Sequence, residues 1–501
     1  MIPDNRFNLI DEPWIPIVDI GNVSLKQVFS YPEYRALGGN PIQKIALTKL
    51  LLAIAQSSYT PENDEDWSSL QPIGLAHHCL NYLEKWHDRF YLYGDKPFLQ
   101  IPAINKAAVQ NFGAVMPEIS SGNTTILTQS QIEKKLTDAD KALLILTLMG
   151  FGLGGKADNT IVLSSTYQGK QNKKGNPSTC NSGAAIGASG FLHNFLQNNT
   201  LHKTLWHNLF THEQISSLRN YPEGIGKAPW EEMPISEDCH VAQALKSSLI
   251  GRLIPVSLFC LLTEIGLHNS EGIAHPGYKE GCFDPSICVN YSSKAPKAIH
   301  VDPEKRPWRS LTTLLSFLSE LNNQAFGFEC QQLHLTLKRM MTHEEKFILW
   351  SGGLKISGGV TRKHYISGSD DFIESTIQLH THDIGETWFS NLQLEMEKLD
   401  HLSKIIYSAT CAYFKNQKTD GVKQAKAASN LLWQLCERRS QELINGCDDL
   451  EKVAALRQAF ANFALTAYDS YCPKETARQL DAWAKNRPNL HSYTYREKES
   501  T

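Results

Sequence analysis

The chain has 501 residues, of which 41% are hydrophobic and 20% are charged, and its formal net charge is −3. A chain of this length buries a large core and is expected to divide into two or more domains. The nearly neutral charge excludes a polycation that binds nucleic acid through its overall field, so any such contact has to come from local basic loops. No run of about 18 apolar residues indicates a transmembrane helix, and the N-terminus lacks the basic-then-apolar pattern of a secretory signal. We therefore expect a cytoplasmic location.

The cysteine, histidine and serine patterns argue against a metal site or a catalytic centre. The 11 cysteines include no C-x-x-C pair, and the closest two, Cys282 and Cys288, are spaced too widely for a zinc knuckle. The 18 histidines are dispersed, without the HExxH spacing of a zinc hydrolase, and there is no G-x-S-x-G nucleophile elbow. We expect reduced thiols, no structural metal, no cofactor and no enzymatic activity.

The chain opens on the string FNLIDEPWIPI at residues 7–17. This string places an apolar pair at Leu9 and Ile10, a turn at Pro13, and Trp14 beside apolar β-forming residues. The pattern predicts the first strand of a globular core.

Short β-type runs and helices alternate over the N-terminal two thirds of the chain. Residues 25–31 are interpreted as a β-type run, and the apolar residues of 41–57 recur at the spacing of a helix. A second helix is expected over residues 72–91, and residues 141–150 (KALLILTLMG) are expected to form a buried apolar element.

Three irregular segments lie between or after these elements. Residues 152–190 are rich in Gly, Ser, Thr and Asn and contain four lysines but only one acidic residue. Residues 266–307 show little periodicity, and residues 351–368 contain three basic residues and no acidic one. Because long loops inside a compact domain usually carry function, these segments are the first candidates for a binding site.

The sequence beyond about residue 369 is almost entirely helix-forming. Four long helices are expected, over residues 385–416, 420–445, 448–471 and 473–486. The breaks between them contain Asp as an N-cap, Gly after a C-terminus and Pro at a first turn, and short connections favour antiparallel neighbours. We therefore predict an α+β protein, with a large mixed α/β N-terminal domain over residues 1–368 and an antiparallel four-helix bundle over residues 369–501.

Residues 150–157 (GFGLGGKA) match half of a phosphate-binding P-loop, G-x4-G-K, with Lys156 as its lysine. Ala157 stands where a Ser or Thr would ligate magnesium, and the next residues do not begin a periodic helix. A glycine-rich loop carrying one lysine is therefore favoured, and a nucleotide hydrolase that uses Lys156 is kept as an alternative.

The opening string also resembles the N-terminus of the CasA family, the large subunits of the type I-E CRISPR Cascade, and the resemblance spans most of the chain. It implies a non-catalytic subunit that binds the guide RNA together with the other Cascade subunits. It further implies that the chain recognises the protospacer-adjacent motif in double-stranded target DNA, helps to nucleate the R-loop and recruits a helicase-nuclease that acts in trans. The protein would then read a short motif, and base pairing would read the rest.

The resemblance implies three segments that contact the DNA motif. The loop at residues 182–187 (SGAAIG) resembles a family loop that enters the minor groove, where the degenerate base pattern suits a backbone reader. Lys279 resembles a motif-contacting lysine that lies upstream of a Pro-containing turn. Residues 352–358 (GGLKISG) resemble a hairpin that wedges apart the first base pairs beyond the motif.

At the wedge this chain departs from the family, because Ser357 and Gly358 stand where the family has Asn and Gln. Lys355 and Ile356 are therefore alternative wedge residues. A tight turn, a solvated lysine and a plain surface hairpin are the alternatives for the three segments. The candidate motif-binding residues are Ser182, Gly183, Ala184, Ala185, Gly187, Lys279, Lys355, Ser357 and Gly358.

Residues 123–129 (NTTILTQ) match the position of a family loop that touches the 5′ handle of the guide RNA. The apolar Ile126 or Leu127 would pack on a base there, although stacking on RNA bases normally uses an aromatic ring. The candidate RNA-contacting residues are Asn123, Thr125, Ile126 and Leu127, and a core strand is the alternative.

The expected bundle carries many cations, which could face a DNA backbone or be solvated. They are interrupted by acidic residues, so a bundle that packs against a partner subunit is equally consistent with the sequence. A scaffold subunit without nucleic-acid contact is therefore a further alternative. These cations are Lys415, Lys418, Lys423, Lys426, Arg438, Arg439, Lys452 and Arg457.

Overall fold

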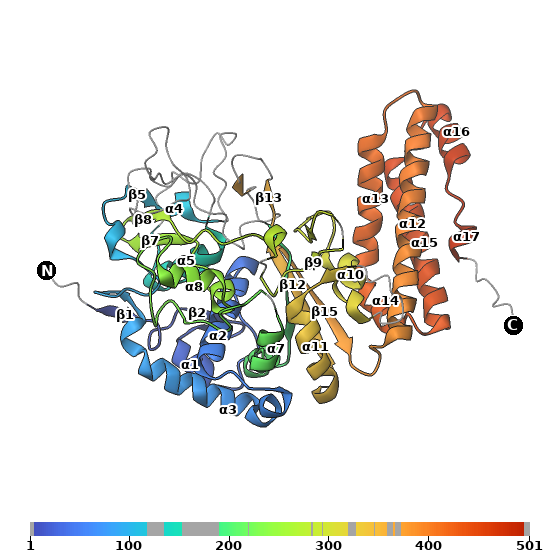
Figure 1. Ribbon diagram of the computed structural model, residues 1–501. Helices are drawn as coiled ribbons and strands as arrows, with labels where there is room; N and C mark the ends of the chain where they lie inside the picture. The colour runs from blue at the N-terminus through green and yellow to red at the C-terminus, as the bar shows by residue number, and fades with distance from the viewer. Residues whose placement is uncertain are drawn as a thin grey trace. The chain divides into compact units, whose positions relative to one another are not determined.

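The structure is a computed structural model, and its chain forms two compact units (Figure 1). The first unit comprises residues 1–307 and 326–376, and the second comprises residues 308–325 and 377–501. The expected domain boundary between residues 368 and 369 stays a prediction. The residues that the structure describes are 5–117, 135–152, 190–218, 220–281, 284–292, 294–318, 327–344, 346–357, 364–365 and 372–494.

The N-terminal strands of the first unit form two short antiparallel pairs. Strand β1 (Arg6–Asn8) pairs with β4 (Tyr91–Tyr93), and β2 (Ile15–Ile17) pairs with β3 (Gly21–Val23). Between β1 and β2 the chain turns, and the indole Nε1 of Trp14 donates a hydrogen bond of 2.9 Å to the carbonyl of Leu9. Both side chains are fully buried. The opening string therefore forms a core strand region, as predicted.

Residues 25–31 are not a β-type run, because helix α1 covers Leu25–Ser30. A capping box explains the difference. The hydroxyl of Ser24 accepts from the backbone N–H of Gln27, and the Gln27 side chain accepts from the backbone N–H of Ser24. This reciprocal pair satisfies two donors that a helix start otherwise leaves unpaired, and it outweighs the β preference of the apolar residues.

Helix α2 (Pro41–Ser58) is the central helix of the first unit and is buried on nearly all sides. It packs against α3 (Asp64–Lys85), α5 (Asp138–Phe151) and strand β12 (Lys346–Leu354), and α3 runs along the outside of the unit in Figure 1. A helix that is apolar all round belongs in the centre of a large core. The helix predicted over 41–57 and the buried element predicted over 141–150 are confirmed.

The helix expected over residues 72–91 has different ends. Helix α3 begins at Asp64 and contains a kink at Gln71, whose φ of 54° and ψ of 162° are not helical. Pro72 follows the kink, and proline restricts the residue before it to non-helical conformations. The helix ends at Lys85, before the expected end at residue 91, and residues 91–93 form β4.

Three sheets carry the rest of the first unit. One has the order β15-β12-β6, the second β5-β8-β7 and the third β10-β9-β11. A separate pair, β13 with β14, continues from β12. The strand bounds are β5 Val109–Asn111, β6 His193–Gln197, β7 Leu258–Leu262, β8 Gly266–Glu271, β9 Val289–Asn290, β10 Lys297–Ala298, β11 Phe328–Glu329, β13 Ile356–Ser357, β14 His364–Tyr365 and β15 Phe372–His380.

Shorter helices connect and cover these sheets. Three of them begin at a side-chain cap, at Asn111, Thr200 and Thr211, whose side-chain oxygens accept from backbone N–H groups one turn on. Their bounds are α4 Phe112–Val115, α6 Leu201–Asn208, α7 His212–Ser217, α8 His240–Lys246, α9 Ile250–Leu253, α11 Gln331–His343 and the 3-10 turn η5 Tyr278–Glu280.

The second unit is helical, which together with the mixed first unit confirms the α+β class. Helices α12, α13 and α15 pack against one another along their lengths, and α16 packs on α12 (Figure 1). Two of the expected helices have different bounds. The second ends at Glu437 and restarts at Ser440, and the fourth begins at Ala477 behind a Thr476 cap. The bounds are α10 Leu311–Leu314, α12 Glu386–Asn416, α13 Val422–Glu437, α14 Ser440–Gly446, α15 Leu450–Tyr471, α16 Ala477–Asn486 and α17 His491–Thr494.

Two general features concern the described residues only. None of their helices combines the length and the apolar composition that crossing a membrane requires. Their cysteines are free thiols, and most of them are buried.

Candidate nucleic-acid interface

Only some of the candidate residues fall in the described part of the chain. Lys279, Lys355 and Ser357 do. Lys156 lies outside the described residues, and so do all the RNA-contacting candidates and the remaining motif-binding candidates. The candidates outside are Asn123, Thr125, Ile126, Leu127, Ser182, Gly183, Ala184, Ala185, Gly187 and Gly358. The structure nevertheless describes residues that adjoin two of these segments in the sequence.

Strand β6 lies beside the strand that leads to the expected wedge. It runs antiparallel to β12, in a register that places His193 opposite Gly352 and Gln197 opposite Ile348. The residues that follow the expected glycine-rich loop therefore lie next to the residues that precede Lys355. Small side chains make this close approach possible, since a Cβ on Gly353 would lie 2.6 Å from the carbonyl oxygen of Phe191.

Gly190 is the first described residue after the expected glycine-rich loop. Its φ of +69° is a left-handed conformation that favours glycine. A Cβ at this position would lie 2.8 Å from Cγ1 of Ile356 and 3.5 Å from the carbonyl oxygen of Leu354. The first described residue after the 182–187 segment therefore lies close to Ile356 of the 352–358 segment.

The third candidate segment is fixed to the same stretch of chain. Bridges pair Phe191 with His300 and His193 with Ile287. The backbone N–H of Asn194 donates to the carbonyl of Ser286 over 2.9 Å. Residues that follow Lys279 therefore run along residues 191–194, and described residues that adjoin each of the three candidate segments lie against residues 190–194.

Lys279 occupies the exposed turn η5. The turn is closed by Gly281, whose φ is +81°, and by a hydrogen bond of 2.9 Å from the backbone N–H of Gly277 to the carboxylate of Glu280. The ring of Tyr278 packs edge-on against Phe191, with 5.5 Å between ring centroids. The turn thus presents an exposed ammonium group from a backbone that is held against residue 191.

Lys355 is half-buried between β12 and β13. Directly after it, Ile356 pairs with Tyr365 and Ser357 with His364. The segment is therefore a two-stranded projection that continues from β12, which fits the hairpin expected from the sequence. Which of its side chains would separate base pairs stays a prediction.

A buried ion pair anchors the segment that carries Lys279. Lys49 of α2 contacts Asp284, and their side chains are 7% and 0% exposed. Burial lowers the pKa of Lys49 to about 7, whereas a carboxylate in direct contact favours the charged ammonium. The carboxylate is further satisfied by Ser286, whose backbone N–H and hydroxyl donate to it over 2.9 and 2.6 Å.

The same network reaches strand β6 through His193. Because the Ser286 hydroxyl donates its proton to Asp284, its oxygen accepts from Nδ1 of His193 over 2.8 Å. Burial and the nearby Lys49 charge hold the pKa of His193 well below its usual range. The imidazole is therefore neutral, with its proton on Nδ1, and the network links α2, β6 and the Lys279 segment.

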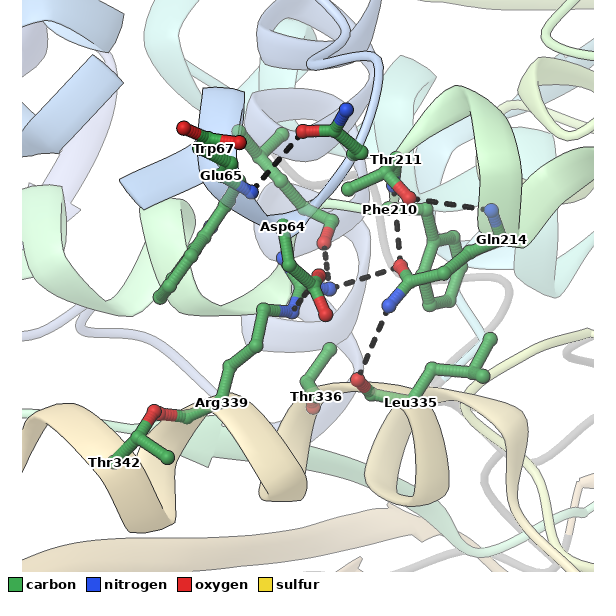
Figure 2. A network of polar contacts seen from close by, with 12 residues as sticks. Asp64, Glu65, Trp67, Phe210, Thr211, Gln214, Leu335, Thr336, Arg339 and Thr342 are labelled. Atoms are coloured by element: carbon green, nitrogen blue, oxygen red, sulfur yellow. Dashed lines mark hydrogen bonds and ion pairs between the residues drawn. The ribbon is translucent and has the colours of Figure 1, made fainter. Parts of the chain in front are cut away.

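A second network joins residues of α3, α7 and α11 to the end of α6, and Figure 2 shows part of it. The guanidinium of Arg339 donates to the carbonyl of Leu209 over 2.6 Å and to Oε1 of Gln214 over 3.0 Å. It also lies 4.8 Å from the ring centroid of Trp67. Burial lowers the pKa of Arg339 to about 10, which the nearby Asp64 opposes.

Trp67 and Trp206 complete this support. Their rings stack with 4.0 Å between centroids, and each indole N–H donates to the backbone carbonyl of the other residue, over 2.8 and 3.0 Å. Next to the stack, the buried His207 has its pKa lowered to about 4, mainly by burial. We interpret this network as structural, because Arg339, Trp67, Trp206 and His207 are buried.

Several cations of the helical unit are already engaged with carboxylates of the same unit. Arg457 contacts Glu395, Arg439 pairs with Glu442, and Lys452 lies 3.3 Å from Asp449. These contacts are consistent with a role in stabilising the bundle. The exposed cations of the set stay candidates for contact with DNA or a partner, and they are Lys415, Lys418, Lys423, Lys426, Arg438 and Lys452.

Sequence reasoning missed Lys49, Asp284 and Tyr291. A signal for Lys49 was present, because a lone lysine inside the apolar run of α2 implies a buried charge with a partner. No local signal identifies Asp284 as that partner, since the two residues are 235 positions apart.

Comparisons with known proteins agree in one family. The model of the family described as CRISPR-associated protein Cse1 matches residues 8–469. The CRISPR-associated protein CasA/Cse1 of Thermus thermophilus is 30% identical over 167 residues, which are 30% of this chain and 32% of that protein. The aligned part therefore spans about a third of this curated relative.

Solved structures resemble the fold over almost the whole chain. Cse1 of Thermobifida fusca has a TM-score of 0.75 at 18% identity, and the match covers 97% of this chain and 98% of that one. A chain of a structure described as a CRISPR RNA-guided surveillance complex has a TM-score of 0.67 at 14% identity, covering 96% and 98%. Such identities show the fold alone, whereas the family match extends over most of the sequence. This chain belongs to the Cse1 family of CRISPR-associated proteins.

Proposed function

We propose that this chain is the large, non-catalytic subunit of a type I-E CRISPR surveillance complex. In this role it recognises the protospacer-adjacent motif in double-stranded DNA, helps to nucleate the R-loop and recruits the helicase-nuclease. Membership of the Cse1 family supports the proposal, as does the similarity to a chain from an RNA-guided surveillance complex. A cytoplasmic location follows from this role.

The observation that supports the proposal is that residues adjoining the three candidate segments lie against residues 190–194. A protein that recognises a short DNA motif needs its contacts in one groove of the duplex. Segments that are anchored at the same part of the fold can reach the same groove. The loop at residues 182–187 would approach through its backbone, and Lys279 would supply positive charge. Ser357 and Gly358, with Lys355 beside them, would lie at the first base step beyond the motif, where insertion costs a few kcal/mol.

The proposal also assigns the contact with the guide RNA. Asn123, Thr125, Ile126 and Leu127 would touch the 5′ handle, with an apolar side chain packed on a base. The other Cascade subunits would hold the rest of the guide. The exposed cations of the helical unit are candidates for contact with DNA or with a sibling subunit.

The test uses the assembled complex with its guide RNA and measures binding to target duplex. We expect Lys279→Ala and Gly183→Asp to weaken duplex binding with little effect on assembly, and Gly183→Asp to act more strongly because it places a carboxylate near phosphates. Loss of one phosphate contact also lowers the salt dependence of binding by about one unit of slope. Lys26→Ala, which removes another exposed lysine of the same unit, is the matched control.

Other results of this experiment would favour other interpretations of what the chain does. Equal loss of assembly would mean that the substituted positions are structural. Unchanged duplex binding in both variants would favour a scaffold subunit that does not contact the DNA. ATP binding by the purified chain, lost in Lys156→Ala, would favour a nucleotide hydrolase.

A further inference from the structure

The turn that carries Lys279 is held by a side chain from a neighbouring strand. The phenol of Tyr291, at the end of β9, donates a hydrogen bond of 2.7 Å to the carbonyl oxygen of Tyr278. Tyr291 itself is tied to the next strand, because its backbone N–H donates to the carbonyl of Gly327 over 3.3 Å. The bond therefore runs from a paired strand to an exposed turn.

The acceptor of this bond restricts the backbone from which the Lys279 side chain departs. The carbonyl of Tyr278 and the backbone nitrogen of Lys279 belong to the same peptide unit, which is planar. Fixing the carbonyl oxygen therefore fixes the plane from which the Cα of Lys279 departs. The Tyr278 ring, packed on Phe191, fixes the preceding residue. Together these contacts restrict rotation of the turn, although the turn has only three residues.

Tyr291 lies outside the core, since it is 38% exposed. The bond from its phenol to a backbone carbonyl orders both partners, at a cost in conformational entropy. The contact therefore restricts the turn and not the core.

We propose that Tyr291 is a positioning residue for Lys279, which holds the lysine turn in the orientation that meets the target duplex. The inference rests on the proposed function, since it requires that Lys279 contacts DNA. Tyr291 acts through the turn, and its hydroxyl, not its ring, is the group that matters.

The test is a double-mutant cycle in the assembled complex, read out as affinity for target duplex. Tyr291→Phe removes only the hydroxyl. We expect it to weaken binding roughly 2- to 12-fold, the range that corresponds to one net hydrogen bond. In the Lys279→Ala background the same substitution should cause no further loss, because residues that act through one another are not additive. Tyr31→Phe, at another exposed tyrosine of the same unit, should leave binding unchanged.

The outcomes separate the two proposals. If Lys279→Ala alone leaves duplex binding intact, the proposed function is wrong at this residue. If Lys279→Ala weakens binding but Tyr291→Phe does not, or if the two losses add, the positioning role is wrong and the proposed function stands. A thermal midpoint lowered by Tyr291→Phe in step with its affinity would also contradict the positioning role, because it would indicate a structural effect.

Discussion

Lys49 and Asp284 form an ion pair inside the first unit, between the central helix α2 and the chain five residues after Lys279. The pair matters because Asp284 also accepts from Ser286, which in turn bonds His193 on β6. One buried network therefore fixes the segment that carries Lys279 to strand β6. Described residues that adjoin the glycine-rich candidate segments lie next to this strand. The exposed candidate residues depend on this buried polar scaffold for their relative positions.

Breaking the Lys49–Asp284 pair should destabilise the chain strongly. Lys49→Met leaves a buried carboxylate and Asp284→Asn leaves a buried ammonium, and each is expected to cost about 3–5 kcal/mol. The double variant removes both charges and should recover much of the loss. Chemical denaturation of the purified chain measures these free energies of unfolding.

Lys44→Met is the matched control for this experiment, because Lys44 lies on the same helix and pairs with Glu374 at a half-buried position. That pair has side chains that are 20% and 32% exposed, so its loss should cost less than the loss of the fully buried pair. A double variant no more stable than the worse single variant would contradict the view that the cost comes from the uncompensated charge.

Gly190→Ala should disturb the contact between two candidate DNA-reading segments. The added Cβ would be strained at a φ of +69° and would lie 2.8 Å from Cγ1 of Ile356. We expect a loss of about 1–3 kcal/mol in stability, together with weaker duplex binding by the assembled complex. Denaturation and a duplex binding assay give the two values.

Gly224→Ala is a control that separates the effect of backbone strain from the effect of displacing a neighbouring side chain. Gly224 has a φ of +62° but open space around its Cβ position. This control should lose stability without losing duplex binding. Adding Ile356→Ala to Gly190→Ala should relieve the steric conflict and recover stability. If Gly224→Ala weakened duplex binding as much as Gly190→Ala did, the effect could not be assigned to the contact with Ile356.

His207 should make stability depend on pH in the acid range. Its pKa is about 4 in the folded chain, because burial outweighs the attraction of Glu344, and about 6.5 when unfolded. The unfolded state therefore binds the proton first. Stability is full above about pH 6.5 and falls as the pH drops towards 4, by about 3 kcal/mol from this residue.

Substitution of His207 by Phe removes this titration while it keeps a ring beside Trp206, whose centroid lies 4.7 Å from the imidazole. The variant should show a smaller loss of stability between pH 6.5 and 4 than the natural chain, measured by denaturation at a series of pH values. Substitution of the exposed His240 by Gln is the control and should leave the acid loss as it was. Parallel pH profiles for the natural chain and the His207 variant would contradict the assignment.

The parts of the fold that the sequence predicted are those set by local periodicity. Helices α2 and α5 have long apolar patterns, and they lie within a few residues of the expected bounds. Helix α1 was misread because it has only six residues and its capping box decides its conformation. The break at residues 438–439, between α13 and α14, carries no glycine or proline, so no local signal marks it.

The residues of the candidate site also divide into those that sequence reasoning found and those that it did not. Lys279 and the 352–358 segment were found through a family resemblance, since single residues on loops have no periodicity. Asp284 contacts helix α2 and Tyr291 contacts the turn η5, and only the three-dimensional structure brings them to these partners. Sequence reasoning thus finds candidate contact residues more readily than the residues that hold them in place.

Arg309 should stabilise the helical unit from outside its four main helices. Its guanidinium lies 3.7 Å from the ring centroid of Trp433 on α13, and Trp308 meets the same ring edge-on at 5.8 Å. Trp433 is 7% exposed, so this cation–π contact is largely desolvated and is worth up to about 2 kcal/mol. Residues 308–318 therefore belong to the core of this unit, although they precede β12 in the sequence.

We expect Arg309→Ala to speed amide hydrogen exchange in α13 of the full chain. Lys474→Ala removes a more exposed cation 4.6 Å from Trp483 and should affect α16 alone. Unchanged exchange in α13 would mean that the four helices hold Trp433 in place without the preceding segment.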